Sequence, residues 1–236
     1  MSNQVLGWRA WLEAGANILF PQQCFACGAP SGSEALCPVC AAGLPGADLA
    51  RCPCCALPVP DGLTCGSCLR EQPPFERTVA ALDYGFPVDR LVHALKYGHR
   101  LAITRLFVDR MAAAGVPEAD LVVPLPLHVS RLHSRGFNQA AELGRALARR
   151  WGLPFVCDGI ERDVNTVPQA GLPWKDRAAN VRGAFRVTTR VEGQRVVVVD
   201  DVMTTGSTLA ELARTLKGVG ALSVENRVLA RTPPPG

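Results

Sequence analysis

The sequence predicts an α/β protein in which a parallel β-sheet with flanking helices follows a small cysteine-rich segment. Three observations carry this prediction. Beyond residue 73, apolar runs of strand length alternate with longer segments of helical pattern, as in a parallel sheet that is covered on both faces. Residues 196–199 are four consecutive valines, which suit a fully buried strand. Nine of the ten cysteines precede residue 69.

Length and composition exclude several classes of protein. The 236 residues are enough for one substantial domain and a small one, and a hydrophobic content of 48% excludes a disordered chain. The net charge of +4 is too small to indicate nucleic-acid binding by itself. No apolar run approaches the roughly 18 residues of a membrane span, and the first residues lack the pattern of a secretory signal. We therefore expect a cytoplasmic protein without a transmembrane segment.

The first 20 residues form a separate element in this prediction. Residues 5–20 have the pattern of a short amphipathic helix that ends at Pro21. We expect this helix to pack on the rest of the protein rather than to anchor it in a membrane.

The cysteines between residues 24 and 68 form an internal repeat. The pattern C-x2-C-x9-C-x2-C occurs twice, with the second copy 28 positions after the first. Two C-x2-C turns supply the four sulfurs of a tetrahedral structural zinc site. The repeat thus predicts two zinc ribbons within residues 21–72, with these consecutive ligand sets: Cys24, Cys27, Cys37 and Cys40, then Cys52, Cys55, Cys65 and Cys68.

Other arrangements of these cysteines remain open. A cross-braced pairing of the two ribbons uses the same eight ligands. A disulfide framework, a redox-active pair and an iron–sulfur cluster are less favoured, because no signal peptide precedes the repeat and its two-turn spacing is typical of zinc. Cys54 and Cys157 fall outside the pattern and are expected to be ordinary residues.

Residues 73–236 carry the predicted sheet, after a boundary at Gln72-Pro73-Pro74. Apolar runs predict strands and periodic segments predict helices. The expected strands are 77–84, 121–125, 195–199 and 223–230, and the expected helices are 88–96, 103–114, 138–151 and 207–219.

The end of the valine run carries the clearest functional signal. Asp200 and Asp201 follow it directly and are followed by a turn of small hydroxyl residues around Gly206 that opens a helix. Such a turn directs backbone N–H groups and hydroxyls at one point beside a positive helix end, which suits a phosphate monoester. The turn is neither a Walker A loop nor a dinucleotide fingerprint. Acids beside a phosphate cradle favour a sugar phosphate as the ligand.

This segment resembles the motif with which type I phosphoribosyltransferases bind 5-phosphoribosyl 1-pyrophosphate (PRPP). Further matches resemble the ComF (competence protein F) family, in which a double zinc ribbon precedes a phosphoribosyltransferase-like domain. They are Leu95-Lys96-Tyr97, Val123-Pro124-Leu125-Pro126 with Arg131, Arg135-Gly136-Phe137-Asn138-Gln139, and the stretch with Thr166, Gln169, Leu172, Arg177, Asn180-Val181 and Gly183-Ala184-Phe185. A basic residue often found before that threonine is Asn165 here, with Arg162 three positions earlier.

The resemblance implies PRPP and Mg²⁺ as ligands and a phosphoribosyl transfer as the activity. It makes Asp200 and Asp201 the catalytic acids that hold the ribose hydroxyls, and Lys96 and Arg135 the pyrophosphate contacts. Lys175 and Arg177 would close over the pyrophosphate as a lid. The implied PRPP site on the strand end and turn consists of Asp200, Asp201, Val202, Met203, Thr204, Thr205, Gly206, Ser207 and Thr208.

Two non-catalytic functions remain as alternatives. One is a PRPP-sensing module that binds the ligand without turnover. The other is a single-stranded DNA-binding module, which a local arginine excess and the family's association with DNA uptake both favour; proteins of the uptake machinery would then be partners. The arginine excess lies in residues 128–150, whose basic residues are Arg131, Arg135, Arg145, Arg149 and Arg150. For acceptor selection, we expect the ribbons and segment 77–84 to form part of a lid.

Overall fold

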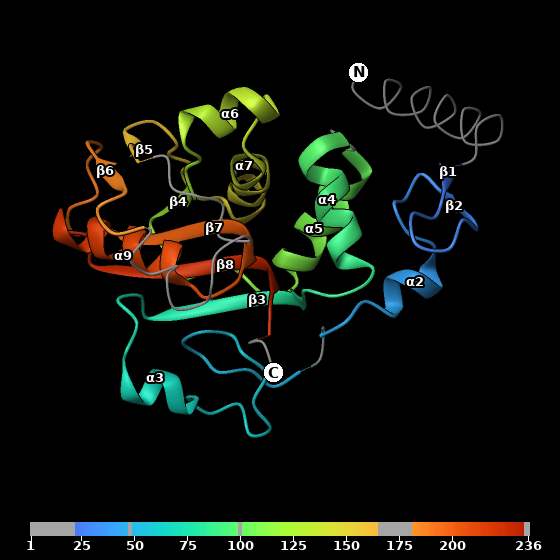
Figure 1. The fold of residues 1–236 in the computed structure, drawn as a ribbon, viewed down its shortest axis with the longest axis horizontal. Coiled ribbons are helices and arrows are strands. Elements are labelled where there is room, and N and C mark those ends of the chain that lie inside the picture. The colour runs from blue at the N-terminus through green and yellow to red at the C-terminus, as the bar shows by residue number, and fades with distance from the viewer. Residues whose placement is uncertain (1–21, 47–48, 99–100, 165–180, 234–236) are drawn as a thin grey trace, which may run out of the picture.

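The computed structural model describes residues 22–46, 49–98, 101–164 and 181–233. Its centre is a four-stranded, wholly parallel sheet in the order β3-β8-β7-β4 (Figure 1). These strands are β3 (Arg77–Asp83), β4 (Leu121–Pro124), β7 (Arg195–Met203) and β8 (Ser223–Arg231). All four match predicted strands, and the predicted fold class is confirmed.

Helices cover both faces of the sheet, as the apolar strands require. They are α4 (Val88–Gly98), α5 (Leu101–Ala112), α6 (Val129–Arg135), α7 (Gln139–Trp151) and α9 (Ser207–Gly218). Helix α6 is not among the predicted helices. A separate antiparallel pair joins β5 (Ile160–Arg162) to β6 (Phe185–Val187). It lies on the side of the sheet that carries α9 (Figure 1).

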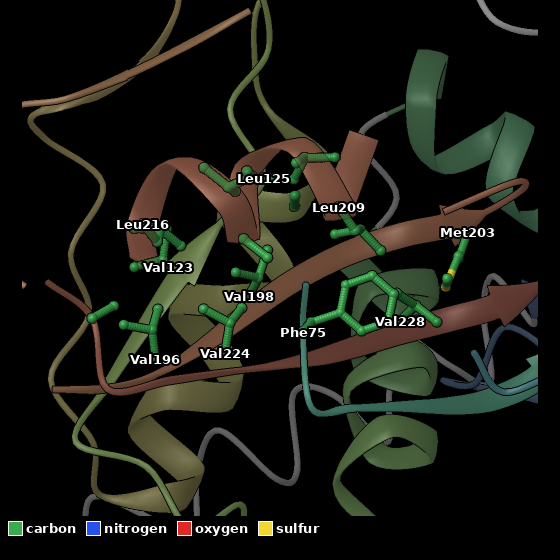
Figure 2. Packing of buried hydrophobic residues seen from close by; sticks show 14 of the residues in the cluster. Phe75, Val123, Leu125, Val196, Val198, Met203, Leu209, Leu216, Val224 and Val228 are labelled. Atoms are coloured by element: carbon green, nitrogen blue, oxygen red, sulfur yellow. The ribbon is translucent and has the colours of Figure 1, made fainter. Parts of the chain in front are cut away.

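The valines of β7 divide between two apolar clusters because successive side chains of a strand point to opposite faces. Val197 and Val199 pack with residues of α4, α5 and α7. Val196 and Val198 pack with α9 on the other face, where Leu209 and Leu216 point from the helix toward the sheet (Figure 2). The fully buried valine run therefore supports helices on both sides at once.

The amino-terminal segment consists of two small ribbons with four short elements. These are β1 (Gln22–Gln23), β2 (Pro30–Gly32), α2 (Pro38–Ala42) and α3 (Gly66–Arg70). Each ribbon packs with the apolar cluster on a different face of the main sheet. Residues such as Leu36 and Leu44 of the first ribbon belong to the cluster with α4 and α5. Ala56 of the second belongs to the cluster with α9.

Residues between the ribbons and at the start of the second ribbon cover strand β3, which is one edge of the sheet. Thr78 N–H donates to the Pro53 carbonyl (3.0 Å) and Asp83 N–H to the Pro45 carbonyl (2.9 Å). Arg51 forms an ion pair with Asp83 at 2.8 Å. An uncovered edge strand offers unpaired backbone groups to other chains. The ribbons thus complete the sheet, and the division of the chain at residue 72 stays a prediction.

One sequence-based expectation is wrong. Segment 77–84 is not part of a lid, because β3 pairs with β8 from Arg77↔Glu225 to Asp83↔Arg231 and is an integral strand of the main sheet.

The predicted helix 5–20 lies outside the described residues. Among the described helices, none is long and apolar enough to cross a membrane.

Gly46 offers a test of the contact between the ribbons and β3. It has a φ of +82°, and an added Cβ would lie 2.5 Å from Arg51 Nη2 and 2.6 Å from Asp83 Cγ. We expect Gly46→Ala to lower the free energy of unfolding by roughly 3 kcal/mol, since it combines a strained backbone with a clash. Gly62→Ala is the control, because Gly62 has a φ of +69° but its nearest neighbour is Ala50 Cβ at 3.8 Å. It should cost about 1 kcal/mol. Equal losses in urea denaturation would contradict the proposed contact.

Candidate functional site

The two acids of the motif lie within strand β7 rather than after it. The predicted strand ends at residue 199, whereas β7 continues to Met203 because the pairing with β8 persists through Asp200↔Val228 and Met203↔Arg231. Strand geometry therefore directs the two carboxylates to opposite faces of the sheet. Both remain at its carboxyl end, where α/β sheets bind ligands.

The turn after β7 is held in place by its glycine and its hydroxyls. Gly206 precedes α9 with a φ of +84°, and a Cβ there would overlap the Cε of Met203. Thr205 Oγ1 accepts a hydrogen bond from Ser207 N–H (3.2 Å) and lies 2.8 Å from Ser207 Oγ. The sequence thus places a compact hydroxyl-lined turn at the positive end of a 12-residue helix.

Lys96 of helix α4 also lies beside these acids. It lies in the last turn of α4, and its Nζ is 3.0 Å from Asp201 Oδ2, with the lysine side chain 24% and the aspartate 12% exposed. Burial lowers the pKa of Lys96, but the charge of Asp201 and the hydrogen bond to it outweigh burial and leave the pKa raised. Lys96 is therefore a permanent cation at this site.

The carboxyl of Asp200 has a raised pKa. Burial first, and then the charge of Asp201, raise the pKa of Asp200 well above its ordinary value of 3.8. The Asp201 N–H donates to Asp200 Oδ1 (2.8 Å), and the Lys96 charge opposes the rise. Burial and the neighbouring carboxylate therefore favour the protonated form of Asp200.

The loop after β4 brings arginines to the site. His128 Nδ1 accepts from Ser130 N–H and caps α6, and Gly136 ends this helix with a φ of +78°. Asn138 then caps α7 through Ala140 N–H and donates to the carbonyl of Leu125, where β4 has just ended. The motif residues Gly136 and Asn138 are thereby given structural roles. They present α6 with Arg131 and Arg135 at the sheet's carboxyl edge.

Three arginines and Lys96 are electrostatically linked to the acids. The charge of Arg135 lowers the pKa of Lys96. Burial and then Arg135 lower the pKa of Arg131, while burial and then Arg131 lower that of Arg162, which Asp200 partly offsets. Arg162, 8% exposed, also lies 5.7 Å from the centroid of the Phe185 ring. Lys96 and Arg162 thus interact with the two carboxyls, and Arg135 and Arg131 belong to the same group of cations.

Arg131 and Arg162 were not predicted as site residues. Arg131 lies four positions before Arg135, so a predicted helix at 129–135 would have placed both on one face. Arg162 reaches the site through an isolated parallel bridge between its strand and His128. Such a non-local pairing leaves no local signal in the sequence.

The predicted lid residues Lys175 and Arg177 lie outside the described residues. The described chain on either side of residues 165–180 is well anchored. Asp163 N–H donates to the carbonyl of Ala184 (2.9 Å), and Gly183 N–H donates to Glu211 of α9 (2.7 Å). Residues 163 and 184 are therefore joined to each other, and residue 183 is tied to α9.

The eight repeat cysteines gather into two groups of four sulfurs. Cys24, Cys27, Cys37 and Cys40 form one group and Cys52, Cys55, Cys65 and Cys68 the other, and within each group the Sγ atoms lie within 4.8 Å of one another. The groups are consecutive, not cross-braced. None of the ten cysteines, all of which the structure describes, forms a disulfide.

The duplication extends to the backbone. Gly28 N–H donates to the Cys24 carbonyl and Ala56 N–H to the Cys52 carbonyl, at 2.8 and 2.9 Å. Gly28 (φ +76°) and Ala56 (φ +57°) are both left-handed and lie 28 positions apart. In both ribbons the third cysteine also precedes a short helix that contains the fourth.

The geometry of both groups fits a zinc ion. Tetrahedral Zn–S bonds of 2.3 Å place sulfurs about 3.8 Å apart, and Cys27–Cys37 and Cys55–Cys65 sulfurs lie 3.8 and 3.6 Å apart. Despite burial, backbone hydrogen bonds lower the pKa of Cys24 to about 6, whereas hydrogen bonds from neighbouring cysteines raise that of Cys40 to about 12. Without a cation, the four sulfurs of a group therefore cannot all be thiolates. The two groups are consistent with two structural zinc sites.

Comparison with known families supports the same organisation. Residues 15–69 match the double zinc ribbon domain, and residues 134–234 match the phosphoribosyl transferase domain. The fold and the cysteine groups thus define a class of protein in which a double zinc ribbon precedes a phosphoribosyltransferase-like domain.

Relatives identify the family within this class. The DNA utilization protein YhgH of Salmonella typhi is 37% identical over 225 residues, which is 91% of this chain and 99% of that protein. Competence protein F of Haemophilus influenzae is 32% identical over 180 residues, or 71% of this chain and 78% of that one. The chain belongs to the ComF (competence protein F) family. A solved glutamine PRPP amidotransferase from B. subtilis is 23% identical, covering 52% of this chain and 25% of that one, with a TM-score of 0.37.

The raised pKa of Asp200 leads to a prediction about pH and stability. A carboxyl whose pKa is raised by folding makes the folded state bind more protons, so stability is full below about pH 4 and falls as the pH rises toward the folded pKa. Asp200→Asn removes this loss of stability at high pH, because the amide does not ionise, and it keeps an acceptor for Asp201 N–H. We expect its melting temperature to exceed that of the wild type at pH 8 by a few degrees, or about 1 kcal/mol, and to match it near pH 4.

Asp158→Asn is the matched control for this experiment. It changes an exposed loop carboxyl and should show no gain at pH 8. Parallel pH profiles for the wild type and Asp200→Asn would contradict a raised pKa of Asp200.

Proposed function

We propose that the protein binds PRPP together with Mg²⁺ at the end of β7 and transfers its phosphoribosyl group. One observation carries the proposal: a hydroxyl-lined turn at the start of α9 adjoins two carboxyls, which interact with Lys96 and Arg162 in a group of four cations. A ligand with a phosphate at one end, hydroxyls in the middle and a more highly charged anion at the other end matches this arrangement of groups.

Each part of the site receives one part of the ligand in this proposal. The turn from Thr204 to Thr208 holds the 5-phosphate through N–H groups and hydroxyls. Asp200 and Asp201 accept hydrogen bonds from the ribose hydroxyls. The pyrophosphate competes with Asp201 for Lys96 and meets the α6 arginines Arg131 and Arg135. The lid assigned to Lys175 and Arg177 remains part of the proposal.

The reaction follows from these positions. The bond between ribose C1 and the pyrophosphate oxygen breaks, the pyrophosphate leaves with the bonding electrons, and C1 bonds to the acceptor. Positive charge develops on the ribose and negative charge on the leaving group, so the acids and the cations stabilise opposite ends of the transition state. Bound beside Asp200 and Asp201, Mg²⁺ would neutralise the leaving group.

The biological role proposed here rests on the relatives. Proteins named for DNA utilization and for competence share most of this chain, so we propose a role linked to DNA uptake, with uptake proteins as partners. We place the protein in the cytoplasm, because a reducing compartment keeps eight metal-binding thiols from forming disulfides.

Thermal stability tests the PRPP proposal. A ligand at a hundred times its Kd stabilises the native state by about 2.7 kcal/mol, which raises the melting temperature of a chain of this size by roughly 5–10 °C. We expect Mg²⁺ with PRPP to produce such a shift in the wild type. Asp201→Asn should abolish the shift, and Asp158→Asn, at an exposed loop position, should preserve it.

Absence of a shift in the wild type would contradict PRPP binding. Where the shift is present, release of pyrophosphate with candidate bases distinguishes a transferase from a PRPP sensor. Turnover supports the transferase, and binding without pyrophosphate release from any of them favours the sensor.

A second candidate function is binding of single-stranded DNA. A groove of about 600 Å³ lies between α5 and α7 and is lined by Arg105, Arg149 and Arg150 against one acid, Asp109. Arg150 pairs with Asp109, whereas Arg105 and Arg149 are exposed and form no ion pair with a described carboxylate. Arg145, on the same helix, lies over the Phe155 ring (4.7 Å). The groove is lined without aromatic residues, so phosphates rather than bases would provide the contacts.

Salt dependence tests this candidate. We expect Arg105→Gln with Arg149→Gln to weaken oligonucleotide binding about tenfold at low salt and to reduce the slope of log K against log salt by about 2, since two phosphate contacts are lost. Arg186→Gln is the control, because Arg186 already pairs with Glu161 and Asp163. An unchanged slope, or an equal loss in the control, would contradict DNA binding in this groove. Asp201→Asn should leave oligonucleotide binding intact.

A further inference from the structure

Arg231 is the largest fully buried side chain among the described residues, with 2% of its surface exposed. It ends strand β8, beside the end of β7. Its guanidinium donates to carbonyl oxygens from two separate parts of the protein. Nε donates to Cys55 in the second ribbon (2.7 Å), and Nη1 donates to Met203 (3.1 Å), Thr204 and Thr232 (2.7 Å).

The partners of Arg231 explain its burial. A buried guanidinium is costly unless its donors are satisfied, and here backbone carbonyls satisfy them. One of these carbonyls belongs to Cys55, whose sulfur is part of the second four-cysteine group. Four thiolates around one Zn²⁺ carry a net negative charge, which favours a nearby cation. The second ribbon therefore suits an arginine at this position both by geometry and by charge.

The other end of Arg231 holds the phosphate-binding turn. Met203 is the last residue of β7 and Thr204 the first residue of the turn. Thr232 N–H also donates to the Met203 carbonyl (3.0 Å). A single side chain therefore links the backbone of a cysteine ligand to the backbone that starts the turn.

The first ribbon has a different attachment. Arg110 of α5 ties it to that helix by donating a hydrogen bond to the Ala41 carbonyl (2.6 Å). This contact lies at α5, on the face of the sheet opposite α9. The two metal groups, although copies in sequence, thus differ in their connection to the turn.

We propose that Arg231 is a positioning residue that fixes the phosphate-binding turn against the second ribbon, so that the second metal group, and not the first, determines the affinity of the turn for a sugar phosphate. The claim about the affinity of the turn for a sugar phosphate rests on the function proposed above. The link between metal group and turn stands on the hydrogen bonds alone.

The first experiment separates positioning from general stability. Ribose 5-phosphate probes the turn, and pyrophosphate probes the cations Lys96 and Arg135. We expect Arg231→Met to weaken binding of ribose 5-phosphate about tenfold, as expected for the loss of charged hydrogen bonds, and to leave the Kd for pyrophosphate within about twofold of the wild type. Arg231→Lys, which keeps the charge but loses the fork of donors, should be intermediate. Titration calorimetry measures both ligands.

Arg227 provides the matched control on the same strand. It is 3% exposed, pairs with Glu225 (2.6 Å) and donates to the carbonyls of Ala114 and Gly115 (3.4 and 3.2 Å), away from the turn. Arg227→Met should destabilise the fold without the selective loss of ribose 5-phosphate binding. The same selective loss in Arg227→Met, or equal losses of both ligands in Arg231→Met, would overturn the proposal.

The second experiment needs no ligand and remains decisive if Arg231→Met does not fold. Hydrogen–deuterium exchange of the amides of residues 203–208 is compared in the full-length wild type, Cys68→Ser and Cys40→Ser, with zinc content measured in each. We expect about tenfold faster exchange in Cys68→Ser, which disrupts the second group, and unchanged exchange in Cys40→Ser, which disrupts the first. Unchanged exchange in Cys68→Ser, or equal effects of both variants, would overturn the link. If the wild type binds neither ligand, the proposed function fails, and the exchange experiment still decides the link.

Discussion

Two carboxyls on consecutive residues of a buried strand need nearby positive charge, and this requirement organises the carboxyl edge of the sheet around Asp200 and Asp201. The strand cannot supply that charge itself, because its valines are committed to apolar clusters on both faces. Three other elements supply it: α4 brings Lys96, α6 brings two arginines and β5 brings Arg162. The caps of α6 and α7 and the anchors beside β5 and β6 are what hold these cations in place. A charged ligand can then replace contacts that the protein already makes with itself.

The ribbons solve a different problem for the same sheet. Four strands leave β3 at an edge, and the ribbon chain covers that edge with two backbone hydrogen bonds and the Arg51–Asp83 ion pair. A segment this short buries little apolar surface by itself. Bound metal would supply the missing folding energy, and the ribbons share the two larger apolar clusters. Because one of these contacts runs through Arg231 to the turn, the metal groups and the ligand site belong to one connected structure.

Local patterns in the sequence predict much of this arrangement. The apolar runs predict all four strands of the main sheet, and the 28-residue repeat predicts the two sulfur groups with their consecutive pairing. The predictions fail where non-local contacts decide. Strand β7 continues past Val199 because β8 pairs with it, β3 joins the sheet instead of a lid, and Arg162 and Arg231 reach their partners from strands distant in sequence. The motif residues Gly136 and Asn138 shape helix ends, a structural role that the hydrogen bonds reveal.

The two proposed ligands share phosphate chemistry, but different surroundings separate them. The site at β7 contains two carboxyls, which would repel a DNA backbone and which suit the hydroxyls of a ribose. The groove between α5 and α7 is lined by three arginines and one aspartate, which suits a run of phosphates without a sugar-specific contact. Helix α7 joins both regions, because Asn138 fixes its start beside β4 and Arg149 lies near its end in the groove. Binding of PRPP and binding of DNA therefore need not compete for the same residues, and one chain can carry both.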